Sequence, residues 1–317
     1  MPHIHRIPMP ENVSADRRPL RALLLYLLAV FAGGALLAPW LYHAVQWLAR
    51  ETPALAGIAK MPFSRYVNRG ILIVAVLGLP WFVRASGIRR WSDVGLDPRH
   101  PRWRRFAAGF ALGLVSLAVV CTVAVAAGAR EVQSHPPGRL ASRLAGALLT
   151  ALIVCVVEEL LFRGAIFGGL RRSVGWKAAM AASSAVYAIV HFMGKPDAPG
   201  AVAWDSGLRV MPSMLRGMTE LHGLVPGFLN LTLAGVILAL AYHATGDLFT
   251  SMGIHAGWIF WLKFYGYLTR GVPGANEWVW GTSKLIDGWF AFAALVVVLT
   301  AVAVLLRRAS PESTLVG

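Results

Sequence analysis

Three charged residues lie in one long apolar stretch, where charge is not expected. Glu158, Glu159 and Arg163 are the charged residues of the segment AGALLTALIVCVVEELLFRGAIFGGL. A charge at mid-membrane costs about 2.5–3.5 kcal/mol on insertion scales, so these side chains need partners. On a helix, Glu159 and Arg163 are four residues apart with the acid N-terminal, which favours an ion pair. Glu158 points about 100° away from Glu159 and stays available as a general base.

Two histidines on other predicted helices could complete a site around Glu158. His191 lies near the end of the apolar segment SSAVYAIVHF, and His255 lies within SMGIHAGWIFW. Either histidine alone could be an ordinary interior residue, and a buried glutamate pair alone more often marks an ion or proton pathway. Together the three side chains supply a base, a second proton-handling group and a third polar group on three helices. That set is enough to bind and activate one water.

Eight apolar stretches predict the helices that position these residues. They are residues 22–49, 70–83, 106–129, 144–170, 178–194, 221–246, 248–262 and 288–306. A membrane helix needs roughly 20 apolar residues, whereas a membrane barrel would show alternating strands of about ten residues. The sequence therefore predicts an all-α, polytopic membrane protein with about eight transmembrane helices. It predicts one transmembrane domain over residues 21–308, with its core motifs in 144–265, between an N-terminal tail (1–20) and a C-terminal tail (309–317).

Composition and charge agree with a membrane protein. Of the 317 residues, 57% are hydrophobic and 14% are charged, whereas soluble domains carry about 25% charged residues. The 30 Lys and Arg against 15 Asp and Glu give a net charge of +15, but they punctuate the apolar stretches instead of forming one face. We therefore expect anionic lipid headgroups as partners and no nucleic acid. The arginine-rich loop at 84–105 predicts a multi-pass plasma-membrane protein with a cytoplasmic N-terminus.

The motifs resemble those of the CPBP intramembrane glutamic endopeptidases, also called the CAAX protease and bacteriocin-processing (Abi) family. EELLFRG, which begins at Glu158, matches the family's EExxxR motif followed by Gly. Tyr187 and His191 match an aromatic residue four positions before a histidine, with Tyr in place of Phe. His255 matches the histidine of the third motif, but Ile259 stands where the family has Asn or Asp.

This resemblance covers about residues 85–265 and implies a CAAX-protease-like core. It also implies hydrolysis of a peptide bond in a membrane-associated protein or peptide, without a covalent acyl-enzyme and without a cofactor. Glu158 would be the general base, His191 would help to orient the water, and His255 would help to stabilise the oxyanion.

Four further residues would support the site. By the same resemblance, Glu159 and Arg163 would brace it, and Tyr187 would pack or form a hydrogen bond near His191. Asn230, in the apolar segment FLNLTLAG, could replace the amide donor that is missing at position 259. An interhelical hydrogen bond is the alternative role for this asparagine.

Two other functions stay open. Glu158, His191 and His255 would also suit a zinc hydrolase with a His2Glu site, although the His-x-x-x-His spacing usual for such sites is missing. A non-catalytic scaffold or immunity protein on the same fold is the other alternative, and Ile259 is the residue that favours it.

Overall fold

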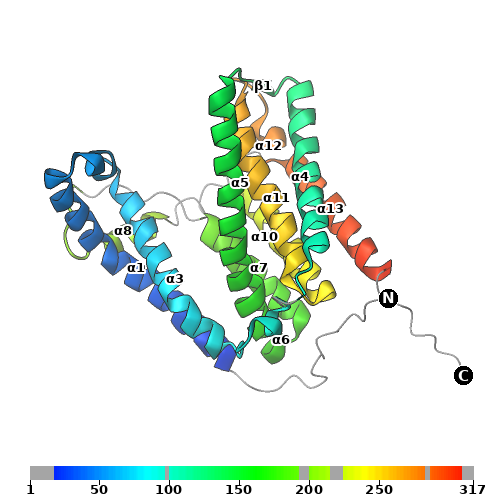
Figure 1. Cartoon of the computed structure of the whole chain (residues 1–317), viewed down its shortest axis with the longest axis horizontal. Helices are drawn as coiled ribbons and strands as arrows, with labels where there is room; N and C mark the ends of the chain where they lie inside the picture. The colour runs from blue at the N-terminus through cyan, green and yellow to red at the C-terminus, as the bar shows by residue number, and fades with distance from the viewer. Residues whose placement is uncertain (1–17, 97–99, 193–199, 215–223, 283–285, 309–317) are drawn as a thin grey trace, which may run out of the picture. The chain divides into compact units, whose positions relative to one another are not determined.

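Helices make up nearly all the regular structure of the computed structural model, which describes residues 18–96, 100–192, 200–214, 224–282 and 286–308 (Figure 1). The chain divides into two compact units, one within residues 88–191 and 222–317 and the other within residues 15–87 and 192–221. The single transmembrane domain that the sequence predicts over residues 21–308 remains a prediction. Of the two expected tails, all but the last three residues of 1–20 and all of 309–317 lie outside the described residues.

The smaller unit is a helical hairpin with a short third helix against it. Its main elements are α1 (Arg18–Glu51), the short α2 (Ala56–Ala59), α3 (Phe63–Ala85) and α8 (Ser206–Met214). Glycines let α1 and α3 approach closely, because a Cβ added at Gly34 or Gly70 would overlap the backbone of the other helix. Tyr26 stacks on Phe82 at a centroid distance of 4.5 Å, which fixes the two helices near the other end of the pair.

The larger unit holds the predicted site residues. Its helices are α4 (Trp103–Ala126), α5 (Pro137–Glu159), a π-helical segment (Leu160–Phe167), α6 (Gly168–Val174), α7 (Trp176–Phe192), α10 (Gly227–Thr245), α11 (Leu248–Leu268), α12 (Glu277–Trp280) and α13 (Trp289–Arg308). Two short strands, β1 (Arg130–Val132) and β2 (Thr269–Gly271), pair antiparallel with Arg130 opposite Gly271. This ribbon was not predicted, and it joins the ends of α4 and α11.

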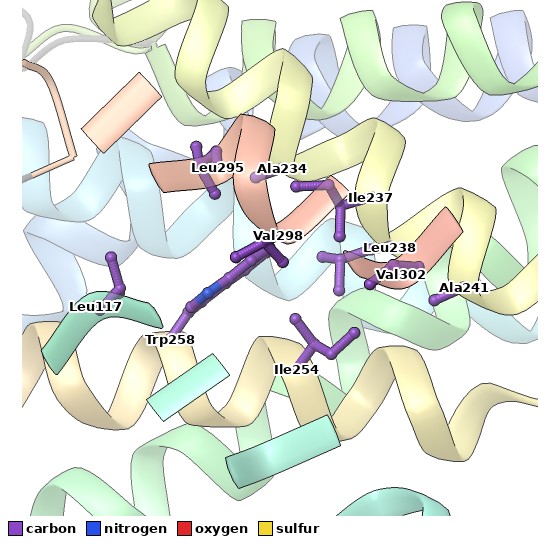
Figure 2. Close-up of a cluster of buried hydrophobic side chains, with 10 residues drawn as sticks. All are labelled: Leu117, Ala234, Ile237, Leu238, Ala241, Ile254, Trp258, Leu295, Val298 and Val302. Carbon is purple, nitrogen blue, oxygen red and sulfur yellow. The ribbon is translucent and has the colours of Figure 1, made fainter. Parts of the chain in front are cut away.

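Small residues set the position of α11, which carries His255. Gly109 and Gly113 of α4 face Gly253 and Gly257 of α11, and a Cβ at any of the four would run into the backbone of the opposite helix. In membranes, such glycine contacts bring two helices close enough for extensive van der Waals packing. On another side of α11, ten buried apolar residues from α4, α10, α11 and α13 form a core cluster, with Trp258 and Ile254 contributed by α11 (Figure 2).

Asp247, just before α11, is a buried acid that ties this helix to α4. Its Oδ1 accepts the backbone N–H of Phe249 at 3.0 Å and so caps the helix N-terminus. Its Oδ2 accepts from Arg102 at 2.6 Å and also from Arg105. These two arginines belong to the arginine-rich segment 84–105, and both have a protein partner in Asp247.

Each of the eight apolar stretches coincides with helical structure, and an all-α membrane protein is confirmed. The count of eight transmembrane helices is not. Five helical segments of the described residues are long and apolar enough to cross a membrane: Arg18–Glu51, Phe63–Ala85, Trp103–Ala126, Pro137–Val174 and Gly227–Thr245. The remaining helices do not meet these criteria of length and apolar character. For example, α7 has only 17 residues.

Candidate active site

The two glutamates lie where α5 changes into a π-helical segment. Glu158 and Glu159 are the last residues of α5, and Arg163 lies inside the π-helical turn that follows. The sequence predicted one uninterrupted helix here, and the widened turn was missed. Single π-helical turns within α-helices are rare and occur frequently at functional sites.

Glu159 is fully buried and binds two cationic or proton-bearing groups at once. Its Oε1 accepts from Nη1 of Arg163 at 2.8 Å, so the predicted ion pair is present despite the π-helical turn. The same oxygen lies 2.8 Å from Nδ1 of His255 on α11. A buried carboxylate requires such partners. Glu159 therefore connects α5 to α11.

Arg163 is buried among aromatic rings and a backbone carbonyl. Its guanidinium lies 4.7 Å from the centroid of the Tyr187 ring and 5.8 Å from that of Phe162. Nη2 also donates to the carbonyl oxygen of Gly235 on α10 at 3.5 Å. These contacts hold the Arg163 guanidinium in place, and the bracing role expected for this residue stays a prediction.

Glu158 faces both histidines. Its Oε2 lies 3.3 Å from Nε2 of His191 on α7 and 3.7 Å from Nε2 of His255 on α11. This oxygen is buried and has no hydrogen-bond donor among the described residues. The structure thus brings together the three residues that the sequence singled out from separate helices.

The opposite nitrogen of each histidine is already occupied. Nδ1 of His255 lies against Glu159, and Nδ1 of His191 lies 2.9 Å from the backbone oxygen of Tyr187. Both partners are hydrogen-bond acceptors, so both Nδ1 atoms carry hydrogen in this network. In a neutral histidine the Nε2 lone pair is then free, and in both residues Nε2 is the atom that faces Glu158.

These side chains open onto a cavity of about 200 Å³ with a mainly apolar lining. Polar groups are few there: Glu158, Tyr187, His191, Asn230 and His255. The apolar lining residues are Leu117, Val154, Leu231, Ala234, Trp258, Ile259, Leu262, Ile286, Ala291 and Leu295. A mostly apolar cavity with a few convergent polar groups is typical of a ligand or active site.

Most side-chain N–H donors around this cavity are already engaged. Asn230 donates to the backbone oxygens of Ile286 at 2.6 Å and Gly288 at 3.0 Å, which uses both hydrogens of its amide. Its Oδ1 has no donor among the described residues. The donor role expected for Asn230 stays a prediction, and this geometry offers an acceptor instead. Trp258, which the sequence did not single out, donates its indole N–H to Ser116 at 3.0 Å.

Tyr187 presents its hydroxyl to the cavity. The hydroxyl oxygen lies 3.4 Å from Nε2 of His255, and the ring lies 4.1 Å from that of His191. The family resemblance implied that Tyr187 lies near His191, but the approach to His255 depends on how α7 packs and had no sequence signal.

The arrangement of possible metal ligands bears on the zinc alternative. Within the described ranges, no group of three or more His, Cys, Asp or Glu side chains is arranged to hold a metal ion. The His2Glu zinc site of Glu158, His191 and His255 stays an alternative prediction.

Comparison with known proteins supports the assignment of the central region. Residues 140–261 match the family model described as "Type II CAAX prenyl endopeptidase Rce1-like". No curated protein and no solved structure matches the chain. The matched residues extend from the start of α5 into α11 and include every predicted site residue. Over this region the chain is similar to the CAAX protease (CPBP) family of membrane proteases.

Proposed function

We propose that the protein is a membrane-embedded endopeptidase in which Glu158 activates a water for attack on a peptide bond. The observation that carries the proposal is the convergence of Glu158, His191 and His255 from three helices on one cavity with an apolar lining. The match to a family of CAAX endopeptidases supports the reaction class.

The hydrogen-bonding capacity of the three residues suits a water nucleophile. The Glu158 carboxylate and the Nε2 atoms of the neutral histidines are all acceptors, because each Nδ1 holds the ring hydrogen. A water between them would donate one hydrogen to Glu158 and the other to His191, which leaves an oxygen lone pair directed into the cavity. Such an orientation supplies proximity and a general base together.

The proposed reaction proceeds in two steps. The water oxygen bonds to the carbonyl carbon while Glu158 takes one of its protons, which gives a tetrahedral oxyanion. The proton then passes from Glu158 to the nitrogen of the scissile bond. The C–N bond breaks and gives a carboxylic acid and an amine, and transfer of the remaining acid proton to the amine leaves a carboxylate and an ammonium group. No acyl-enzyme forms and no cofactor takes part.

The oxyanion needs hydrogen-bond donors, and Tyr187 is the residue we assign to supply one. Among the described side chains that line the cavity, the N–H groups of Asn230 and Trp258 are committed elsewhere, and Ile259 has none. The Tyr187 hydroxyl faces His255 at 3.4 Å, so it can turn from this nitrogen to an oxyanion in the same space. A donor of this kind typically contributes about 10²- to 10³-fold in rate.

The substrate we infer is a membrane-associated protein or peptide, because the cavity accepts apolar groups and lies within a bundle of membrane helices. The test is to express the chain and its Glu158→Gln variant in cells and to compare new protein N-termini in the membrane fractions, which requires no known substrate. New termini with the wild type and none with Glu158→Gln are expected. Glu131→Gln is the matched control, since Glu131 is an exposed carboxylate paired with Arg270 on the ribbon. Equal sets of termini from wild type and Glu158→Gln would instead favour the scaffold alternative.

A further inference from the structure

A second cavity lies far from Glu158, at the ribbon end of α5 and α11. Its volume is about 850 Å³, and its lining includes Arg139, Arg143 and Gly146 of α5 and Lys263 and Tyr267 of α11. Figure 1 shows α5 and α11 side by side with β1 at this end. Arg143 and Glu158 are fifteen residues apart on one helix, which corresponds to about 22 Å. This groove is therefore distinct from the proposed active site.

The groove gathers positive charge that no described acid neutralises. Within the described residues, none of Arg139, Arg143 and Lys263 forms an ion pair with an acid. Glu131 of the neighbouring ribbon is engaged by Arg270 at 2.7 Å. Three like charges around one cavity repel each other, so an anion in the groove would be stabilised by all three.

Arg143 lies over an aromatic ring. Its guanidinium lies 5.3 Å from the centroid of the Tyr267 ring. His135 also contacts Tyr267. Its ring stacks on the Tyr267 ring at a centroid distance of 3.9 Å, and its Nε2 lies 2.8 Å from the Tyr267 backbone oxygen. A cation–π contact orients a guanidinium without neutralising it. The contact with Tyr267 thus orients the charge of Arg143.

Glycines leave room for a ligand along α5. A Cβ added at Gly138 or Gly146 would meet no atom within 4 Å. Beyond the groove, Leu149 and Ile153 of α5 are exposed and follow the lining residues Gly146 and Thr150 at a spacing of three residues, which places them on the adjoining face. The ligand should therefore carry an anionic group and an apolar chain that can follow Leu149 and Ile153.

We propose that this groove binds an anionic phospholipid, with its phosphate between Arg139, Arg143 and Lys263 and an acyl chain along Leu149 and Ile153 of α5. Basic side chains and tyrosines at the end of a membrane helix lie at headgroup depth. Arg143 and Arg139 occupy the first two turns of the candidate span Pro137–Val174, which places them there. The proposal does not depend on the peptidase assignment.

Native mass spectrometry of the full chain in neutral detergent tests this proposal, with phosphatidylglycerol and phosphatidylcholine as probes. We expect the wild type to retain phosphatidylglycerol in preference to phosphatidylcholine. The variant Arg139→Gln/Arg143→Gln/Lys263→Gln should bind phosphatidylglycerol about a hundredfold more weakly, since each basic residue near an anionic surface contributes a factor of about five. The control Arg65→Gln/Arg69→Gln/Arg84→Gln makes the same change of charge on exposed residues of α3 and should keep the preference.

A second variant separates the groove from its charge. Gly146→Leu fills the open space without altering any cation, and leucine is the better helix former, so the protein should fold. This variant should also lose phosphatidylglycerol. Equal retention of both lipids by the wild type, or equal losses in the two triple variants, would overturn the proposal. Displacement of the lipid by inorganic phosphate at equal concentration would overturn it as well, since the site would then take a free phosphate.

Discussion

Nδ1 of His255 lies 2.8 Å from Oε1 of Glu159, a carboxylate with no exposed surface. The same carboxylate oxygen accepts from Arg163. Glu159 is thus the side chain that orients His255 so that its Nε2 faces Glu158. Glu159 therefore has two roles. It positions His255, and through its ion pair with Arg163 it stabilises the turn that follows α5.

Breaking the buried ion pair of Glu159 and Arg163 should lower stability more than replacing both residues by apolar ones. Glu159→Leu leaves the Arg163 guanidinium buried without its carboxylate, and we expect a loss of about 3–5 kcal/mol of stability. The double variant Glu159→Leu/Arg163→Met removes both charges and should recover most of that loss. Denaturant unfolding of the wild type, the single variant and the double variant in detergent measures these differences in stability. A double variant no more stable than the single one would show that the charge pair is not the cause.

Tyr187→Phe should lower kcat by about 10²- to 10³-fold with little change in KM, because it removes a donor used only in the transition state. The ring that packs on Arg163 and His191 remains, so the melting temperature should stay close to that of the wild type.

Ile259→Asn in the Tyr187→Phe background tests whether the lost donor can be restored. Position 259 lines the same cavity one turn after His255, so an amide there can reach the space that the hydroxyl occupied. Partial recovery of kcat in the double variant is expected. Full activity of Tyr187→Phe alone would rule out the assignment of this donor.

The peptidase should be independent of metal. Activity of the purified protein should survive treatment with a zinc chelator, and added Zn²⁺ should not raise it. Loss of activity with the chelator and its return with Zn²⁺ would instead establish the His2Glu zinc hydrolase.

Close packing between α4 and α11 should be sensitive to a single added side chain. Gly113→Leu would drive a side chain into the backbone at Ile254, and overpacking of this kind typically costs about 1–3 kcal/mol or more. Gly266→Ala, also on α11, meets no atom within 4 Å and is the matched control. We expect a lower melting temperature for Gly113→Leu and an unchanged or higher one for Gly266→Ala. The opposite order would show that this glycine contact does not support the site.

Residues whose types are unusual for their surroundings could be identified from the sequence, and their predicted proximity can be compared with the structure. Charges at Glu158, Glu159 and Arg163 stand out in an apolar stretch, and the i, i+4 pair depends only on local helix geometry. His191 and His255 were identified with their motifs, and the structure places them against Glu158.

Contacts between helices could not be predicted in the same way, because they depend on how each helix is rotated and how closely it approaches its neighbour. The engaged amide of Asn230 and the approach of the Tyr187 hydroxyl to His255 are both of this kind. Asp247 lies between two apolar stretches, which is typical of a loop acid, yet packing of α4 on α11 buries it against Arg102. The three-residue strands of the ribbon are too short to give a periodic pattern.

The role of Glu158 is tested most directly by the purified protein in liposomes. The substrate is a peptide that spans a cleavage site found in cells, and the wild type is compared with Glu158→Gln and with the control Glu131→Gln. The proposed mechanism predicts cleavage by the wild type and by Glu131→Gln, and a fall of about 10³-fold or more for Glu158→Gln, as for the loss of a general base and its proton transfer. Cleavage by Glu158→Gln at the wild-type rate would contradict it.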